Sequence, residues 1–257
     1  MSEKYLIDKA SLTALADITR AYNETPDKEY SLEEVTEQVK EASETLHDMF
    51  GEGVTELRSE TATEIGNYAF SGISKETEPY MNVYLPNVTH IGTNSFRNNY
   101  IGKVYMPNVR TTGTTTGNVF FQSYIYRSVY MPLLEELNQS DFANCNLYGS
   151  LYLSGLLTMN SRAFAINGTS TGYMILKSLP ILNGTIAQGN AAGMRFFVKS
   201  GLLAEMEATT NWTYVVSKAT VREATTYEAD YEDIWKMLIE DGFLTEEEIR
   251  RDFYAES

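Results

Sequence analysis

The chain has few of the residues that build disulfides, metal centres or membrane-spanning segments. Its 257 residues include one cysteine, Cys145, and two histidines, His47 and His90. A single cysteine excludes an internal disulfide and a cysteine-based metal cluster, and two histidines are too few for a histidine-rich metal site. No apolar run approaches the roughly 18 residues that a membrane span needs. We therefore expect no bound metal and no membrane association, and the opening MSEKYLIDKASL does not resemble a secretory signal.

Catalytic motifs are also scarce. The sequence contains no glycine-rich phosphate loop, no nucleophile elbow, and no histidine beside a cysteine or serine in a known motif. Acidic residues at 230–233 and 246–248 lack the spacing of a calcium loop, so we expect them on a solvated face. These observations predict a protein that is not an enzyme and that uses no cofactor.

The negative charge of the chain is concentrated at its two ends. Residues 1–50 carry 12 acidic and 5 basic residues, a net charge of −7, and residues 217–257 carry the same numbers. Residues 51–216 carry 11 acidic and 10 basic residues, a net charge of −1. A nearly neutral middle lacks the basic surface that binds nucleic acid or anionic membranes, so neither is an expected partner.

A short strand phrase repeats through the middle of the chain. Its copies are NVYLPN at 82–87, KVYMPN at 103–108, SVYMPL at 128–133, SLYLSG at 150–155, YMILKS at 173–178 and RFFVKS at 195–200. Successive copies are 21, 25, 22, 23 and 22 residues apart. One short strand in each period of about twenty residues is typical of a solenoid, in which stacked units share a continuous core.

A second phrase lies between the strands, and in it an aliphatic residue or methionine precedes a phenylalanine by five positions. The pairs are Ile65 with Phe70, Ile91 with Phe96, Leu137 with Phe142, and Met159 with Phe164. We expect these residues, and Cys145, to form the solenoid core. The longer Thr- and Gly-rich segment 109–121 and the segment 181–194 depart from the pattern and are expected to be its least regular turns.

These phrases resemble the BspA-type leucine-rich-repeat family. The best copy is YLPNVTHIGTNSF at 84–96, and the segment 196–218, with its Asn211-Trp212 pair, resembles the last repeat of that family. The resemblance covers about 54–217. It implies an α+β leucine-rich-repeat solenoid with one short parallel sheet, which we place at 51–217 between a helical N-terminal hairpin at 1–50 and acidic C-terminal helices at 218–257.

The N-terminal region is expected to form two helices separated at Pro26. Ser31 and Glu34 are spaced as a capping box, and apolar residues at 32, 35, 39, 42, 46 and 49 form a seam with heptad-like spacing. This seam is consistent with an intramolecular cap on the first repeat or with a helical bundle that joins copies of the chain. Residues 12–42 resemble the helical hairpins of tail proteins from phages that infect Gram-positive bacteria.

The C-terminal region is also expected to be helical. Tyr231, Ile234, Trp235 and Leu238 form an apolar stripe, Asp241-Gly242 is a helix stop, and Thr245 with Glu248 is a capping box.

The repeated strands also predict a row of large side chains on one sheet face. Side chains alternate between the two faces of a strand, so the residues flanked by core positions should point outward. They are Tyr84, Tyr105, Tyr130, Tyr152, Ile175 and Phe197, and Tyr80, Tyr126 and Tyr148 are placed to extend the row. This row is consistent with stacking that only stabilises the sheet, with a face covered by the terminal helices, or with a surface that binds a protein or glycan.

Taken together, the sequence favours a non-enzymatic phage virion protein, such as a tail, baseplate or fibre component. Its expected partners are other virion proteins and a host surface protein or glycan, with a homo-oligomer through residues 1–50. The alternative is a bacterial cell-surface adhesin of the same repeat family.

Overall fold

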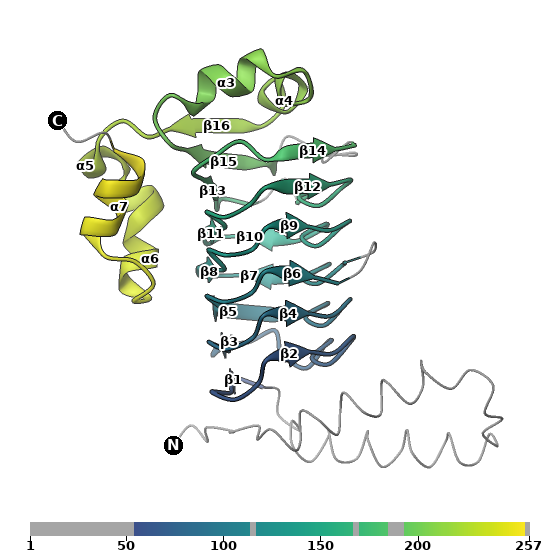
Figure 1. Ribbon diagram of the computed structural model, residues 1–257. Coiled ribbons are helices and arrows are strands. Elements are labelled where there is room, and N and C mark those ends of the chain that lie inside the picture. The colour runs from purple at the N-terminus through teal and green to yellow at the C-terminus, as the bar shows by residue number, and fades with distance from the viewer. Residues whose placement is uncertain (1–53, 114–116, 167–169, 185–192, 255–257) are drawn as a thin grey trace, which may run out of the picture.

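The chain folds as a parallel β-solenoid that carries helices at its C-terminal end (Figure 1). The computed structural model describes residues 54–113, 117–166, 170–184 and 193–254. Every strand pairing within these ranges is parallel. The helical hairpin and the seam expected at 1–50 lie outside the described residues.

Within the described residues, the repeated phrases form the largest sheet, which has ten strands. Its main path runs through β1 (Glu56–Arg58), β3 (Met81–Tyr84), β5 (Tyr100–Tyr105), β8 (Val129–Tyr130), β11 (Leu151–Tyr152), β13 (Met174–Leu176), β15 (Arg195–Val198) and β16 (Thr220–Glu223). Two further strands, β7 (Tyr124–Ile125) and β10 (Asn146–Leu147), pair with each other, and β7 also pairs with the start of β5.

The expectation of a single sheet was incomplete, because the second phrase of each repeat also forms strands. These short strands are β2 (Glu64–Ile65), β4 (His90–Ile91), β6 (Thr111–Thr112), β9 (Glu136–Leu137), β12 (Thr158–Asn160) and β14 (Ile181–Asn183). In the described ranges they make two sheets of three strands each. Five of these strands direct an aliphatic residue or methionine into the core, and β6 instead directs the buried Thr112 inward, so the solenoid has sheet on two sides of the same core.

The core consists of equivalent residues stacked from turn to turn, as the repeat pattern predicted. Phe96, Phe120 and Phe142 are buried, with ring centroids 5.3 and 4.9 Å apart along the stack. Cys145 is buried too, and its thiol donates to the carbonyl of Phe120. Stacking of this kind makes each turn depend on its neighbours for burial.

A residue with a left-handed backbone lies two positions before the buried phenylalanine in each of five turns, those of Phe70, Phe96, Phe120, Phe142 and Phe164. The φ values are 59° at Tyr68, 57° at Asn94, 48° at Asn118, 63° at Ser140 and 58° at Arg162. Asparagine tolerates this conformation better than most residues with a side chain, which accounts for its use in two of the five turns.

A buried carboxyl group ties the enlarged repeat to the next turn. The Asp141 carboxyl accepts hydrogen bonds from the Thr112 hydroxyl at 2.5 Å, the Asn138 backbone at 2.8 Å and the Val119 backbone at 3.2 Å. Burial raises the pKa of Asp141 to about 7, against the lowering effect of these three donors. Residues 114–116 of this repeat lie outside the described ranges.

The last repeat is closed by α3 (Leu202–Ala208) and α4 (Thr210–Val216), which lie over β16 and β14 at the end of the solenoid (Figure 1). The Trp212 indole is buried and donates to the carbonyl of Pro180 at 2.9 Å. The sheet then continues through β16 to Glu223, beyond residue 217, where we placed the end of the repeats from sequence.

Short helical elements of the C-terminal region lie beside the largest sheet (Figure 1). They are α5 (Tyr227–Asp230), the π-helical η2 (Tyr231–Trp235), α6 (Lys236–Glu240) and α7 (Glu246–Phe253). As expected from sequence, α6 stops before Gly242, whose φ is 75°, and Thr245 and Glu248 form a capping box on α7. We call residues 227–254 the C-terminal helical unit.

Candidate functional site

The outward-facing side chains predicted from the repeats do lie in one row across the largest sheet. Strand register aligns Tyr84, Tyr105, Tyr130, Tyr152, Ile175 and Phe197 on successive strands. The four tyrosine rings are stacked nearly parallel, with centroids 5.0, 5.6 and 5.4 Å apart. We call these six residues the ladder.

Half of the ladder is not available to a partner, which corrects the expectation that all six side chains are exposed. Tyr152 retains 3% of its accessible surface, and Ile175 and Phe197 retain none. The C-terminal helical unit covers them, and the Trp235 ring packs edge-on against Phe197 at 5.1 Å while Phe253 contacts the rings of both Tyr152 and Phe197. The terminal helices thus use this part of the sheet as their own hydrophobic core.

The other half of the ladder remains partly open. Tyr105 and Tyr130 are half-buried, and each contacts the ring of Phe243 at about 5.5 Å. Tyr84 lies beyond this contact, and the guanidinium of Arg58 sits 4.0 Å from its ring centroid. Burial raises the pKa of both Tyr105 and Tyr130, so these phenols stay neutral and offer hydroxyl groups rather than charge.

Charged contacts hold the C-terminal helical unit on the sheet. Asp241, at the end of α6, has a side chain only 2% exposed, and its carboxylate accepts from Arg127 at 2.7 Å and from the Ser128 backbone at 3.4 Å. At the other end of the unit, Lys177 pairs with Asp252 at 2.8 Å. The Asp241 contacts hold one edge of the C-terminal helical unit, which we also call the cover, near the middle of the ladder.

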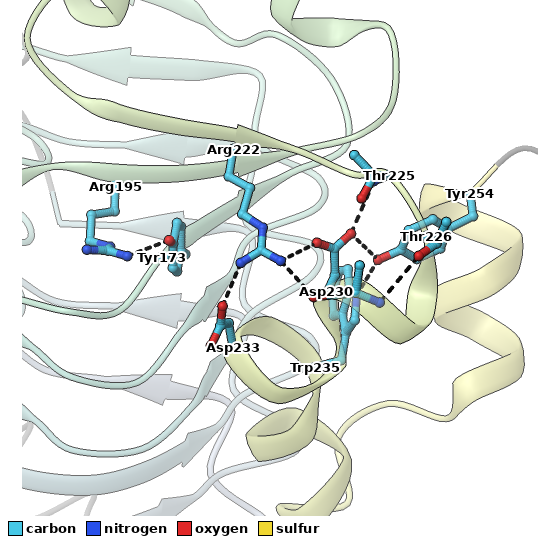
Figure 2. A network of polar contacts seen from close by, with 10 residues as sticks. Tyr173, Arg195, Arg222, Thr225, Thr226, Asp230, Asp233, Trp235 and Tyr254 are labelled. Atoms are coloured by element: carbon cyan, nitrogen blue, oxygen red, sulfur yellow. Dashed lines mark hydrogen bonds and ion pairs between the residues drawn. The ribbon is translucent and has the colours of Figure 1, made fainter.

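A buried carboxylate also organises the interior of the unit (Figure 2). Asp230 is fully buried and accepts from Arg222 at 2.6 Å, from the Thr225 backbone at 3.1 Å and from the Tyr254 hydroxyl at 2.9 Å. The Tyr254 hydroxyl in turn accepts from the Trp235 indole at 2.7 Å. Our expectation that this acidic stretch is solvated is therefore wrong for Asp230, because Arg222 on β16 neutralises it.

A second group of tyrosines was only partly anticipated from sequence. Its members lie at the starts of the strands, on four successive turns, and we call them the tyrosine cluster: Tyr80, Tyr100, Tyr124, Tyr126 and Tyr148. Three of them were expected to lengthen the ladder. They instead stack on one another: the ring centroid of Tyr126 lies 3.8 Å from that of Tyr80 and 5.3 Å from that of Tyr148. Tyr100 and Tyr124 were missed, although both stand just before a buried isoleucine in their repeats, which was the available signal.

The part of the chain that the structure describes contains no group of three or more His, Cys, Asp or Glu side chains placed to hold a metal ion. In the same ranges, no helix has the length and apolar character needed to cross a membrane.

The stacked parallel turns define a repeat protein of the leucine-rich solenoid class. The comparison with protein families identifies the repeats: the model described as "BspA type Leucine rich repeat region" matches six copies across residues 54–170. This part of the chain is therefore a BspA-type leucine-rich-repeat region, and the resemblance seen in the sequence is confirmed over residues 54–170. No curated protein and no solved structure matches the chain.

Leucine-rich-repeat solenoids are typically non-catalytic scaffolds that bind other proteins through their extended surface. The family match thus supports a repeat surface for protein binding.

Proposed function

We propose that the chain is a non-enzymatic recognition protein that binds a macromolecular partner at the open half of the ladder, Tyr84, Tyr105 and Tyr130. One observation carries the proposal: the chain buries the last three rungs under its own helices and leaves three stacked tyrosines partly exposed beside them. Tyrosine combines a large apolar area with a polar tip and is enriched in interfaces.

The proposed biological setting is a phage virion, where the chain serves as a tail, baseplate or fibre component. This setting is supported by the resemblance of residues 12–42 to helical hairpins of phage tail proteins. The proposed partners are other virion proteins and a host surface protein or glycan. The test is to purify intact particles and identify the chain in them by mass spectrometry. Its absence from particles of a producing culture would contradict this setting.

The second candidate is a bacterial cell-surface adhesin. It is favoured by the repeat family itself, whose members are often surface-associated. Surface labelling of intact bacteria that express the chain at its native level distinguishes the two settings, because an adhesin is labelled on cells and a virion component is recovered with particles.

The binding surface is tested by removing two ladder rings together. We expect Tyr105→Ala with Tyr130→Ala to weaken attachment to host cells, or incorporation into particles, by about 2 kcal/mol or more, as for interface hot spots. Phe243→Ala is the matched control, because it removes the ring that touches both tyrosines and loosens the cover without shortening the ladder. Equal losses in the control and the double variant would remove the ladder as the binding site.

We further propose that residues 1–50 join copies of the chain through the apolar seam at positions 32–49. Substitution of Val35 and Val39 by aspartate in the full chain places charge in this seam and should convert an oligomer to a monomer in light scattering. A wild-type protein that is already monomeric at micromolar concentration would favour an intramolecular cap instead.

A further inference from the structure

The tyrosine cluster is a second exposed surface that the ladder does not include. Its five rings come from four successive turns, and each is partly exposed. Their ring contacts are with one another, as in the pairs Tyr100–Tyr124 at 4.8 Å and Tyr124–Tyr126 at 6.4 Å. None of the five belongs to the hydrophobic core that the C-terminal helical unit forms with the sheet. In the described residues, this patch therefore lacks the helical cover that closes the far half of the ladder.

The way the rings stack restricts what this surface can bind. Tyr80 and Tyr126 lie face to face at 3.8 Å with an angle of 3° between their planes, and Tyr148 follows on the other side at 22°. A sugar that packs on an aromatic ring needs a free ring face, and both faces of Tyr126, at the centre of the cluster, are occupied by the rings of Tyr80 and Tyr148. The cluster presents ring edges and hydroxyl groups, which suit a protein segment better than a glycan.

Two glutamates and one lysine, Lys75, are next to the cluster in the chain, so the net charge of this stretch is negative. Glu76 is exposed and lies at Tyr100, where burial first and then this carboxylate raise the pKa of the phenol. Glu78 is exposed two residues before Tyr80. Within the described residues, neither glutamate takes part in an ion pair, and the nearby Arg127 is committed to Asp241 and Glu240. At the open half of the ladder the cations beside the rings already have carboxylate partners: Arg58, which lies over the Tyr84 ring, pairs with Glu60, and Lys103, which lies over the Phe243 ring, is 3.9 Å from Asp241.

We propose that the tyrosine cluster is a docking surface for a protein segment that carries arginine or lysine side chains. The two glutamates pair with the cations of the segment, and the phenol hydroxyls and ring edges contact its backbone and apolar side chains. The inference rests on the proposed recognition function and adds a second surface with its own class of partner. Charge complementarity steers such a segment to this patch.

The test uses the full chain and synthetic peptides immobilised in matched sets. One set carries arginine and lysine among aromatic and aliphatic residues, a second replaces the cations with citrulline and acetyl-lysine, and an array of neutral glycans is probed in parallel. We expect binding to the cationic set alone. Glu76→Gln with Glu78→Gln should weaken it about tenfold or more, the size expected for lost charge-assisted hydrogen bonds.

Two matched variants separate local recognition from the overall acidity of the chain. Glu205→Gln with Glu207→Gln removes the same charge from exposed positions on α3, and it should leave peptide binding unchanged. Tyr124→Ser with Tyr148→Ser should weaken binding, whereas Tyr68→Ser, at an exposed tyrosine outside the cluster, should not. Equal losses in the two glutamine variants, equal binding to the citrulline set, or binding to glycans alone would each overturn the inference.

The double variant Tyr105→Ala with Tyr130→Ala distinguishes this inference from the proposed function. It should keep its affinity for the cationic peptides while losing attachment to cells or particles. If the peptides bind only through the ladder, the inference about the cluster is overturned and the ladder proposal stands. If attachment is unaffected by the ladder variant while peptide binding requires the cluster, the ladder proposal is overturned instead.

Discussion

The two halves of the ladder occupy equivalent positions in successive repeats and yet differ in chemistry. Tyr84, Tyr105 and Tyr130 are partly exposed tyrosines, whereas Ile175 and Phe197 have no polar atom and are fully buried. Tyrosine is tolerated at a partly solvent-exposed position because its hydroxyl remains solvated. An exposed pair of isoleucine and phenylalanine would instead favour aggregation. The change from tyrosine to apolar side chains comes one rung after the covering begins, because Tyr152 is already buried under the C-terminal helical unit.

This change indicates that the C-terminal helical unit is a permanent part of the fold. Lifting it would expose Phe197, Trp235 and Phe253, which are buried against one another, and would leave Asp230 and Asp241 without their arginine partners. The free-energy cost of exposing that much apolar area is far larger than any gain from freeing the half-buried rings of Tyr105 and Tyr130 for a partner. The part of the ladder that is open to a partner therefore stops near Tyr130, and a partner would contact the N-terminal turns of the solenoid.

The comparison is tested most severely by truncating one rung from each half. Phe197→Ala removes a fully buried ring beneath Trp235 and should lower the free energy of unfolding by about 3–5 kcal/mol. Tyr84→Ala removes a partly exposed ring that stacks on Tyr105 and should cost less than about 1 kcal/mol. Chemical denaturation followed by fluorescence measures both, and similar losses in the two variants would show that the halves are energetically alike.

The chain offers a convenient way to assign such losses to a region. Its two tryptophans, Trp212 and Trp235, lie in the cap of the last repeat and in the C-terminal helical unit. Replacing either by phenylalanine leaves a single reporter. In Phe197→Ala, we expect the Trp235 signal to change at lower denaturant than the Trp212 signal.

Much of this arrangement followed from sequence because a repeat fixes one position relative to the next. The alternation of inward and outward side chains around Tyr84 and Tyr105 placed six outward side chains in register. The spacing of Ile91 and Phe96 identified the core. Repeat periodicity determines such local geometry because each turn contacts only its neighbours.

The cover was not predicted with the same certainty, because it depends on contacts across more than a hundred residues. Asp241 meets Arg127, and Trp235 meets Phe197, through a fold-back that no local pattern specifies. The stripe of Trp235 and Leu238 showed that these helices have an apolar face, but it left open which surface that face covers. Covering by terminal helices was one of three interpretations of the ladder, and it applies to half of it.

The pH dependence of stability provides the next test, because the titrating residue, Asp141, lies in the solenoid and not in the C-terminal helical unit. The folded chain holds Asp141 with a pKa of about 7, above the roughly 3.9 of an unfolded aspartate. Between these values the folded state retains a proton that the unfolded state releases, so this residue should lower stability as pH rises from about 4 to about 7, by on the order of a few kcal/mol. Denaturation midpoints of wild type and Asp141→Asn across this range measure the effect.

The Asp141→Asn variant should lose this part of the pH dependence. Both tryptophan reporters should show it if the cover unfolds together with the solenoid. Parallel pH profiles for the variant and the wild type would contradict the buried, protonated carboxyl group.

A smaller loss is expected where the cover is held at the middle of the ladder. Asp241→Ala removes the acceptor of Arg127 and should destabilise the protein by about 1–2 kcal/mol, since the arginine side chain is 41% exposed and returns to water. Glu232→Ala is the control, because it breaks an exposed pair with Lys236 and should cost less than about 1 kcal/mol. If Asp241→Ala is no more costly than the control, the ion pair does not hold the cover in place.

The smallest effect should come from the N-terminal turns of the solenoid, away from the C-terminal helical unit, and should be a gain in stability. Tyr68 is 59% exposed and has φ 59°, and the equivalent positions in the next two turns carry Asn94 and Asn118. Because asparagine adopts the left-handed region at lower cost than an aromatic residue, Tyr68→Asn should stabilise the protein by about 0.5–1 kcal/mol. Tyr68→Ala is the control for loss of the ring alone, since alanine gains nothing from the left-handed backbone. Thermal unfolding should therefore order the three proteins with Tyr68→Asn the most stable. An asparagine variant no more stable than the alanine variant would show that backbone strain at this turn does not limit the N-terminal half.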